Sequence, residues 1–176
     1  MSQYRRTSPD EVYFVTLTVV GWLDVFTRVE YKNILVENLQ YCQQKEQLEV
    51  YAYALMSNHL HLVARRQDKD MNELLGRFKS VTAKKLLTAI EANPQESRKE
   101  WLLNQFQHFA LRNQQYGKYH FWQYSSHAVL LDTPILFDQK VEYIHQNPVR
   151  AGLVTSAESY VYSSACPESP LKMMEL

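Results

Sequence analysis

The sequence of 176 residues has few cysteines, no long apolar run and no net charge. The first two shortages each exclude a class of protein. Its two cysteines, Cys42 and Cys166, belong to no CxxC pair, so neither a disulfide framework nor a structural zinc site is expected. No apolar run approaches the roughly 20 residues that span a membrane. The polar residues 1–10 lack the apolar core of a signal peptide. We therefore expect a cytoplasmic protein without a membrane partner.

The charges balance overall but are unevenly distributed along the chain. Nineteen basic and 19 acidic side chains give a net charge of zero, whereas nucleic-acid-binding proteins usually have a basic excess. Residues 65–85 hold seven basic and three acidic side chains, a local net charge of +4. Such a run is usually the solvated face of a helix, and a phosphate-binding surface is the alternative.

Hydrophobic periodicity predicts a mixture of strands and helices. Ser57 and Asn58 are good turn formers, which predicts a hairpin around them. The last helix is expected to end near His145, because Pro148 disfavours the helical conformation in the residue before it. The expected strands cover residues 12–20, 50–55, 60–64 and 128–131, and the expected helices cover residues 31–44, 71–91, 101–112 and 134–145.

The order of these elements predicts an α+β fold. Strand–helix–strand–strand–helix–strand is the split βαβ pattern, an antiparallel sheet with helices packed on one face. The residues between Glu91 and Phe121 interrupt this order as a helical insertion. We expect one domain over residues 1–176, with a core over about residues 12–165, a polar N-terminal arm and a C-terminal tail.

His59 and His61 are separated by one residue on a predicted strand. Side chains at i and i+2 of a strand point to the same face, with backbones about 7 Å apart, so two imidazoles can converge on one metal ion. Leu60 between them would then point into the core. Imidazole is a good metal ligand, but so short a pattern also occurs by chance, and the pair alone does not establish a metal site.

Tyr143 and Asn147 lie four residues apart on the last predicted helix and share one of its faces, with Lys140 on the same side. Taken alone, Tyr143 is best interpreted as an aromatic residue at the edge of the core, and Asn147 as a cap of the helix end. Phe121 and Trp122 can stack on unpaired bases, but core positions are their default interpretation.

Together, five segments resemble the REP-associated tyrosine transposases, a branch of the single-tyrosine HUH transposases of the IS200-like kind. They occur in the family's order and cover most of the chain. The YIHQNPVRAGLV segment is specific to this family. The HLH pair supports the resemblance only when it occurs together with that segment. The segments are LMSNHLHL (residues 55–62), RFKSVTA (77–83), FWQ (121–123) with His127, YIHQNPVRAGLV (143–154) and YVYSSA (160–165).

The resemblance implies a ferredoxin-like nicking-domain fold, in agreement with the predicted strand order. It implies that His59 and His61 bind a divalent ion, Mg²⁺ or Mn²⁺, and that Asn147 completes the metal site. Tyr143 would be the nucleophile. The implied enzyme cleaves single-stranded, hairpin-forming DNA of REP-like repeats through a 5′-phosphotyrosine intermediate and then rejoins strands. Both a monomer and a homodimer remain open.

The predicted DNA contacts come from the basic segment, the aromatic motif and the helix of Tyr143. One alternative function is a domesticated protein that binds DNA hairpins without cleaving them. Another is a metal-dependent hydrolase with water as its nucleophile, but its carboxylate base is missing, since Asp68 and Asp70 lie past the predicted strand. The predicted DNA-binding residues are Arg65, Arg66, Arg77, Lys79, Lys84, Trp122 and Lys140.

Overall fold

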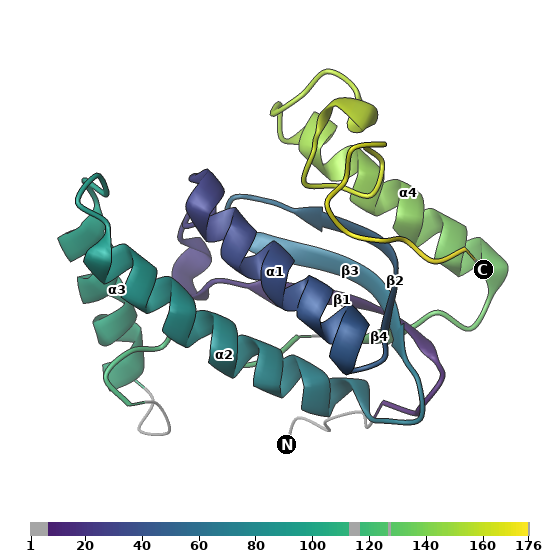
Figure 1. The fold of residues 1–176 in the computed structure, drawn as a ribbon, viewed down its shortest axis with the longest axis horizontal. Coiled ribbons are helices and arrows are strands. Elements are labelled where there is room, and N and C mark those ends of the chain that lie inside the picture. Colours follow the sequence, from purple (N-terminus) through teal and green to yellow (C-terminus); the bar gives the residue numbers. More distant parts are fainter. Residues whose placement is uncertain (1–6, 113–116, 127, 176) are drawn as a thin grey trace.

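The computed structural model describes residues 7–112, 117–126 and 128–175, which are built on a four-stranded antiparallel sheet (Figure 1). The strands follow the spatial order β2-β3-β1-β4, so that the first and third strands lie in the middle of the sheet. This order and the intervening helices are those of a ferredoxin-like fold, and the predicted α+β class is confirmed. The strands are β1 (Val12–Thr18), β2 (Leu48–Leu55), β3 (His59–Arg66) and β4 (Val129–Leu130).

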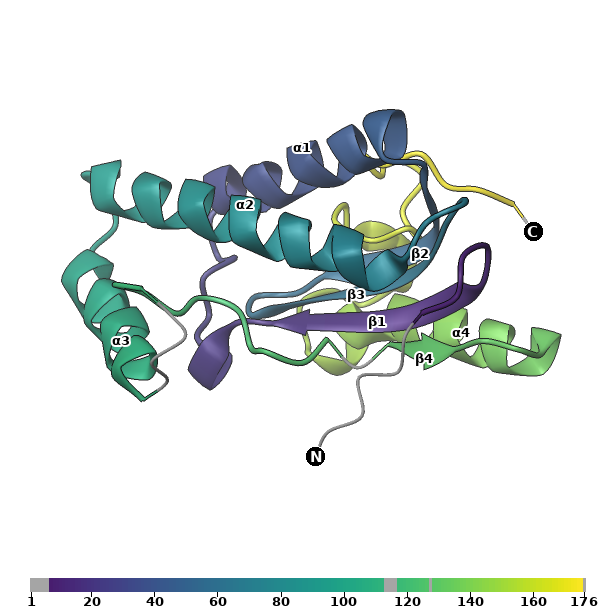
Figure 2. The same ribbon diagram turned by 90° about the horizontal axis from the view of Figure 1, so that it is seen from below.

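Helices cover both faces of this sheet. α1 and α2 lie side by side on one face, as the sequence predicts, whereas α4 crosses the opposite face (Figure 2). The sequence predicted helices on one face of the sheet, and the structure adds α4 as a layer on the other face. None of the described helices is long and apolar enough to cross a membrane. The helices are α1 (Val29–Lys45), α2 (Met71–Ala92), α3 (Lys99–Leu111) and α4 (Pro134–Arg150), with short 3-10 turns η1 (Val20–Trp22) and η2 (Ala157–Ser159).

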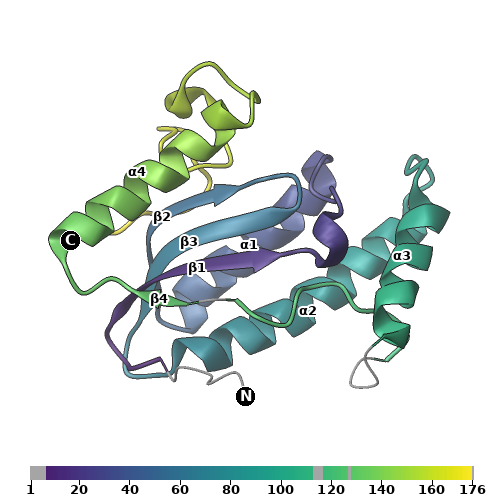
Figure 3. The ribbon, with the colours of Figure 1, turned by 180° about the vertical axis from the view of Figure 1, so that it is seen from behind.

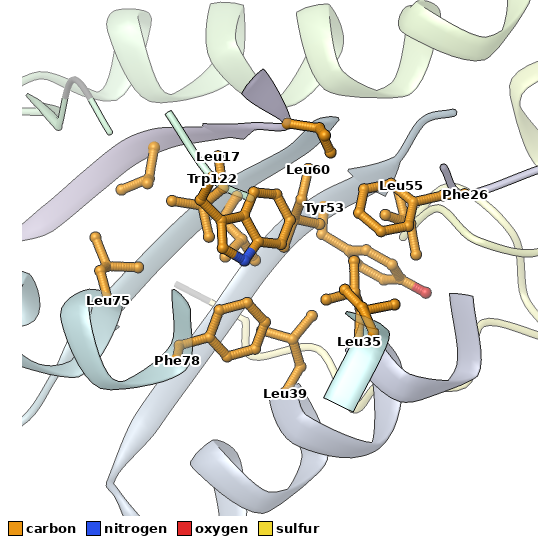
Figure 4. Close-up of a cluster of buried hydrophobic side chains, with 14 of the residues drawn as sticks. Leu17, Phe26, Leu35, Leu39, Tyr53, Leu55, Leu60, Leu75, Phe78 and Trp122 are labelled. Atoms are coloured by element: carbon orange, nitrogen blue, oxygen red, sulfur yellow. The ribbon is translucent and has the colours of Figure 1, made fainter. Parts of the chain in front are cut away.

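The alternation of side chains along the strands explains the two layers. In β3, Leu60 and Leu62 belong to the main core, which the sheet shares with α1 and α2. Figure 4 shows Leu60 in this cluster with Phe78 of α2 and Leu39 of α1. Val63, of opposite parity, belongs to a second apolar cluster that includes Ile144 of α4. Because both faces of the sheet are apolar, each requires a helix to cover it.

The hairpin predicted around Ser57 and Asn58 is confirmed. β2 and β3 pair antiparallel, and the amide of Met56 donates to the carbonyl of His59 at 2.8 Å. The register places Ala54 of β2 and Thr16 of β1 on either side of His61. The histidine ring therefore emerges from the middle of the sheet between two small side chains.

α4 continues past its predicted end to Arg150, with Pro148 inside the helix. Proline removes one main-chain donor, which here would have bonded to the carbonyl of Ile144. Because the residue stands in the last turn, the helix loses only that bond. The side-chain amide of Asn147 donates to the carbonyl of Tyr143 at 2.8 Å, and the amide of Ala151 donates to the carbonyl of Asn147 at 2.9 Å.

α3 forms the predicted helical insertion, and it packs against η1 at the end of β1. Gly21 of η1 has a φ of +62°, and a Cβ atom there would lie 2.5 Å from Cζ of Phe109. Only glycine combines this backbone conformation with so close an approach. The insertion thus holds the turn that contains Trp22.

The segment after α4 follows the outer edge of β2 (Figure 3). The amide of Leu55 donates to the carbonyl of Tyr162 at 2.9 Å, and the amide of Met174 donates to the carbonyl of Val50 at 2.8 Å. These bonds occupy main-chain groups that an edge strand otherwise exposes to other chains. His145 of α4 also contacts Ser164 of this segment, with 2.9 Å between Nε2 and Oγ, so the segment helps to fix α4 on the sheet.

Candidate active site

His59, His61 and Tyr143 meet on the face of the sheet that α4 crosses. The ring centroids of the two histidines are 4.6 Å apart, and those of His61 and Tyr143 are 5.4 Å apart. Phe14 of β1 contacts the last two, stacked on His61 at 5.4 Å and edge-on to Tyr143 at 6.0 Å. The structure therefore brings three of the predicted site residues together within one chain.

Packing of α4 explains why Tyr143 is accessible. Its neighbour Ile144 is fully buried in the apolar cluster that contains Phe14 and Val63. A helix turns by about 100° per residue, so anchoring Ile144 directs Tyr143 to the margin of the contact. Tyr143 keeps 38% of its surface exposed, so the residue is accessible to solvent.

Asn58 determines which nitrogen of His59 carries the proton. Its Nδ2 donates to the carbonyl of Trp22 at 3.2 Å and to Oδ1 of Asp24 at 3.0 Å. The amide is thereby oriented with its own Oδ1 2.6 Å from Nδ1 of His59. Since an amide oxygen can only accept, Nδ1 of His59 must donate, and its Nε2 carries the lone pair that a metal requires.

His61 is oriented by a similar contact from the neighbouring strand. Oγ1 of Thr16 lies 2.8 Å from Nδ1 of His61, which leaves Nε2 for a ligand. Burial lowers the pKa of His61 to about 3, and the nearby His59 and Lys140 act in the same direction. Burial also lowers the pKa of His59, against the opposing effect of Asp24. Both imidazoles are therefore neutral near pH 7, the form that binds metal ions.

These features fit a site for one divalent ion. Two neutral imidazoles share a strand face and keep Nε2 free of the contacts made by Nδ1, but no third His, Cys, Asp or Glu side chain of the described residues joins them in a metal-binding group. Asn147 lies one turn beyond Tyr143, and its Nδ2 is bonded to the carbonyl of Tyr143. Its assignment as the third ligand stays a prediction.

Two cations flank the ring of Tyr143. Nζ of Lys140 lies 5.6 Å from the ring centroid, and Cζ of Arg150 lies 5.7 Å from it. Lys140 was predicted from helical spacing, whereas Arg150 was missed, although it stands two turns after Tyr143 on the same side of α4. Positive charge at this position attracts a phosphate.

The loop between η1 and α1 carries Asp24 and is held by the segment before α3. Nη1 of Arg98 donates to the carbonyl of Asp24 at 2.8 Å. The carboxylate of Glu96 is buried between Arg98, at 3.2 Å, and Arg28, at 3.0 Å. Burial acts to raise the pKa of Glu96, but hydrogen bonds from the two arginines outweigh it and hold the pKa below its usual value. No pattern in the sequence predicted that these residues hold the loop of Asp24.

The prediction that Arg66 contacts DNA is wrong. Its side chain is enclosed, and the residue is only 2% exposed. Nη2 pairs with Glu46 at 2.8 Å, Nη1 lies 3.4 Å from Glu73, and Nη1 also donates to the carbonyl of Asp70 at 2.8 Å. A buried guanidinium needs such partners, and these leave none of it for a phosphate.

The remaining basic residues of segment 65–85 do not form a free basic face. Arg77 pairs with Glu46 at 2.6 Å and with Glu73 at 3.0 Å, and Nε of Arg65 donates to Glu49 at 2.6 Å. The basic residues of α2, which include Arg77, lie on the opposite side of the sheet from the histidine pair (Figure 2). Their contacts with DNA stay predictions, and such contacts would be remote from Tyr143.

The two lysines predicted on α2 differ in their surroundings. Nζ of Lys79 donates to the carbonyl of Tyr124 at 2.8 Å, and burial lowers its pKa to about 8. Lys84 is exposed. Of the two, only Lys84 presents its charge freely to solvent, and a DNA contact by either one stays a prediction.

The prediction that Trp122 stacks on DNA bases is also wrong. The residue is 4% exposed and lies in the main core beside Phe78 and Leu17 (Figure 4). Its Nε1 donates to Oγ1 of Thr82 at 3.0 Å, which satisfies the buried donor. The strand pairing of Val19 with Trp122 directs the ring inward, so no face is open to a base. His127 of the same motif lies outside the described residues.

Comparison with known proteins supports the resemblance. Residues 23–105 match the family model described as Transposase IS200 like, a segment that contains both histidines but not Tyr143. A solved structure of a REP-associated tyrosine transposase bound to a REP hairpin has the same fold, with a TM-score of 0.57 and 16% sequence identity, over 93% of this chain and 82% of that one. No curated protein matches the chain. The resemblance drawn from the motifs is thus confirmed, in that residues 23–105 are similar to the IS200-like transposases and the fold is similar to that of a REP-associated tyrosine transposase.

Proposed function

We propose that this chain nicks and rejoins single-stranded, hairpin-forming DNA, with Tyr143 as its nucleophile. The observation that carries the proposal is the contact of Tyr143 with His61, whose ring centroids are 5.4 Å apart. A hairpin is the proposed substrate because the solved structure with this fold is bound to a REP hairpin. Since the histidines and the tyrosine meet within one chain, a monomer is the proposed active unit.

His59 and His61 would hold the divalent ion through their Nε2 atoms, with Asn147 as the predicted third ligand. When bound, such an ion, Mg²⁺ or Mn²⁺, polarises a phosphate and stabilises the charge that develops on it. Asn58 and Thr16 keep both Nε2 atoms directed to the same side by engaging the opposite ring nitrogens. The protein would thus fix the orientation of the two histidine rings before an ion binds.

The chemical step is an exchange of phosphodiester bonds. The phenol oxygen of Tyr143 forms a bond to phosphorus, the bond from phosphorus to the 3′ oxygen breaks, and the phenol proton is in net terms transferred to that oxygen. A tyrosine with its usual pKa near 10 is a poor nucleophile at neutral pH. Lys140 and Arg150 attract the phosphate to this position. A second strand's 3′-hydroxyl reverses the step and rejoins DNA, so no ATP is needed.

A denaturing gel tests the proposal directly. Wild-type protein, incubated with a hairpin DNA that has single-stranded arms and with Mn²⁺, is expected to form an adduct that survives denaturant. Tyr143→Phe should bind the same hairpin and form no adduct. Tyr41→Phe is the matched control, because Tyr41 is exposed on α1, across the sheet from the site. An adduct with Tyr143→Phe would show that the nucleophile is a different residue.

Hairpin binding without cleavage is the second candidate function. It is favoured by the ligand set, since the described residues offer no group of three His, Cys, Asp or Glu side chains that could hold a metal ion. The same gel separates the two functions, because a binding protein retains the hairpin and gives no adduct with either Mg²⁺ or Mn²⁺.

A further inference from the structure

An exposed tryptophan extends the row of rings at the proposed active site. Trp22 is 60% exposed, and its ring lies edge-on to His59 with 6.0 Å between centroids. His59 is followed by His61 at 4.6 Å, and His61 by Tyr143 at 5.4 Å. The indole therefore stands at the opposite end of this row from the proposed nucleophile.

The backbone of Trp22 is held in an unusual conformation. Its φ is +55°, a region that bulky residues rarely occupy. Several contacts impose it: the amide of Trp22 donates to the carbonyl of Val19 at 3.1 Å, and its carbonyl accepts from Asn58 at 3.2 Å. On the other side, Gly21 packs against Phe109 of α3. Strained residues fixed by their surroundings gather at functional sites.

Core packing does not account for the indole. The neighbouring Val20 and Leu23 are buried in the main core, whereas Trp22 is not part of it. Trp122, by contrast, is buried in the main core. The protein thus keeps a large apolar ring in solvent, beside the two histidines, where it gains little from burial.

We propose that Trp22 stacks on an unpaired base close to the phosphate that Tyr143 attacks. This proposal rests on the proposed function, since it concerns the DNA that enters the same site. A strand whose phosphate lies at Tyr143 and His61 passes His59 and reaches the open face of the indole. Aromatic rings stack on any base with little sequence preference, and a base can take part only if it is unpaired. Trp22 is thereby a positioning residue that favours single-stranded over paired DNA at the cleavage point.

The first test compares two DNA probes. One is a hairpin with a single-stranded thymidine arm, and the other is the same hairpin with an abasic arm, which keeps the phosphates and lacks the bases. Wild-type protein should bind the thymidine arm roughly 5- to 100-fold more tightly. Trp22→Asn should bind both probes alike; asparagine tolerates positive φ, so the turn is kept. Trp101→Asn is the matched control, because Trp101 is 49% exposed on α3 and lies in no ring contact with the histidines.

The outcomes of this comparison separate the stacking role of Trp22 from the proposed function. A thymidine preference that survives in Trp22→Asn overturns the stacking role and leaves the proposed function intact. Equal binding of the two probes by the wild type does the same. If the wild type binds neither probe and forms no adduct, the proposed function itself fails. A purely structural role of Trp22 would weaken binding of both probes equally and leave their ratio unchanged.

Fluorescence gives a second, independent measurement. In Trp101→Phe protein the emission comes from buried Trp122 and exposed Trp22. Stacking predicts that the thymidine arm quenches this emission more strongly than the abasic arm. The added change Trp22→Phe should remove that difference. Equal quenching by both arms in Trp101→Phe protein would contradict a base stacked on Trp22.

Discussion

Oδ1 of Asn58 accepts a hydrogen bond from Nδ1 of His59 at 2.6 Å, and this contact directs the other ring nitrogen toward the site. The orientation of the amide depends in turn on Asp24 and on the carbonyl of Trp22. A predicted metal ligand is thus oriented by residues that are not predicted to bind the metal. Such supporting contacts usually matter nearly as much as the ligands.

Asn58→Ala should therefore weaken metal binding without removing a ligand. We expect Mn²⁺ affinity to fall by about 10- to 100-fold, because His59 can then adopt the other tautomer and ring orientation. Titration calorimetry with Mn²⁺ measures the change. Asn33→Ala, an exposed change on α1, is the control and should bind Mn²⁺ as the wild type does. An Asn58→Ala protein with undiminished affinity would remove Asn58 from the metal site.

Arg150 should contribute to the rate of adduct formation more than to DNA affinity. Its guanidinium lies 5.7 Å from the ring of Tyr143, where it can stabilise charge on the phosphate and on the phenol oxygen. For Arg150→Ala we expect the rate to fall by at least about 10-fold, since the loss of one charge-stabilising donor commonly costs more than that. Single-turnover kinetics on denaturing gels measure this rate.

Arg112→Ala provides the comparison, because Arg112 is exposed at the end of α3 and equally removes one positive charge. If both variants slow the reaction to the same extent, the effect belongs to the overall charge of the protein and not to the position of Arg150.

The site shows what local patterns of the sequence can predict. The alternation of a strand places His59 and His61 on one face and Leu60 in the core, and this part of the prediction agrees with the structure. Local patterns do not specify which face of the sheet α4 covers. That depends on matching its apolar stripe, centred on Ile144, to the second face of the sheet.

The two incorrect predictions of DNA contacts have one physical origin. Arg66 and Trp122 were assigned to DNA because basic and aromatic side chains suit nucleic acids, but the same side chains are stable inside when partners are supplied. Glu46 is distant from Arg66 in the sequence, and Thr82 is distant from Trp122, so these partners become visible only in three dimensions. For the same reason Asp24, Asn58 and Thr16 were missed around the histidines.

Glu96 predicts a pH dependence of stability. Its pKa is lower in the folded protein than in the unfolded chain, so its stabilising effect is present above the unfolded value of 4.5 and is lost as the pH falls through the lower folded value. Glu96→Gln should lower the free energy of unfolding by about 2 kcal/mol at pH 7, since it removes hydrogen bonds between charged groups. The difference from the wild type should shrink below pH 4.5.

Urea denaturation at pH 7, 5 and 4 follows this difference. Glu37→Gln is the control, because Glu37 is an exposed carboxylate on α1, and its variant should show no such pH dependence. A difference between wild type and Glu96→Gln that stays constant down to pH 4 would show that the carboxylate charge is not what stabilises the loop of Asp24.

The positive φ of Gly21 and its close approach to Phe109 predict that the turn beside the site tolerates no side chain at this position. In Gly21→Ala the Cβ would collide with Phe109 and the residue would keep a positive φ, so we expect a loss of about 2–3 kcal/mol in the free energy of unfolding. Gly152→Ala has a φ of +70° but no atom within 4 Å of the new Cβ, so it isolates the backbone contribution of about 1 kcal/mol. Adding Phe109→Ala to Gly21→Ala tests the collision, because the two changes together should then cost less than their sum. Strict additivity in urea denaturation would mean that Phe109 does not hold the turn, and the fixed orientation of Trp22 would need another cause.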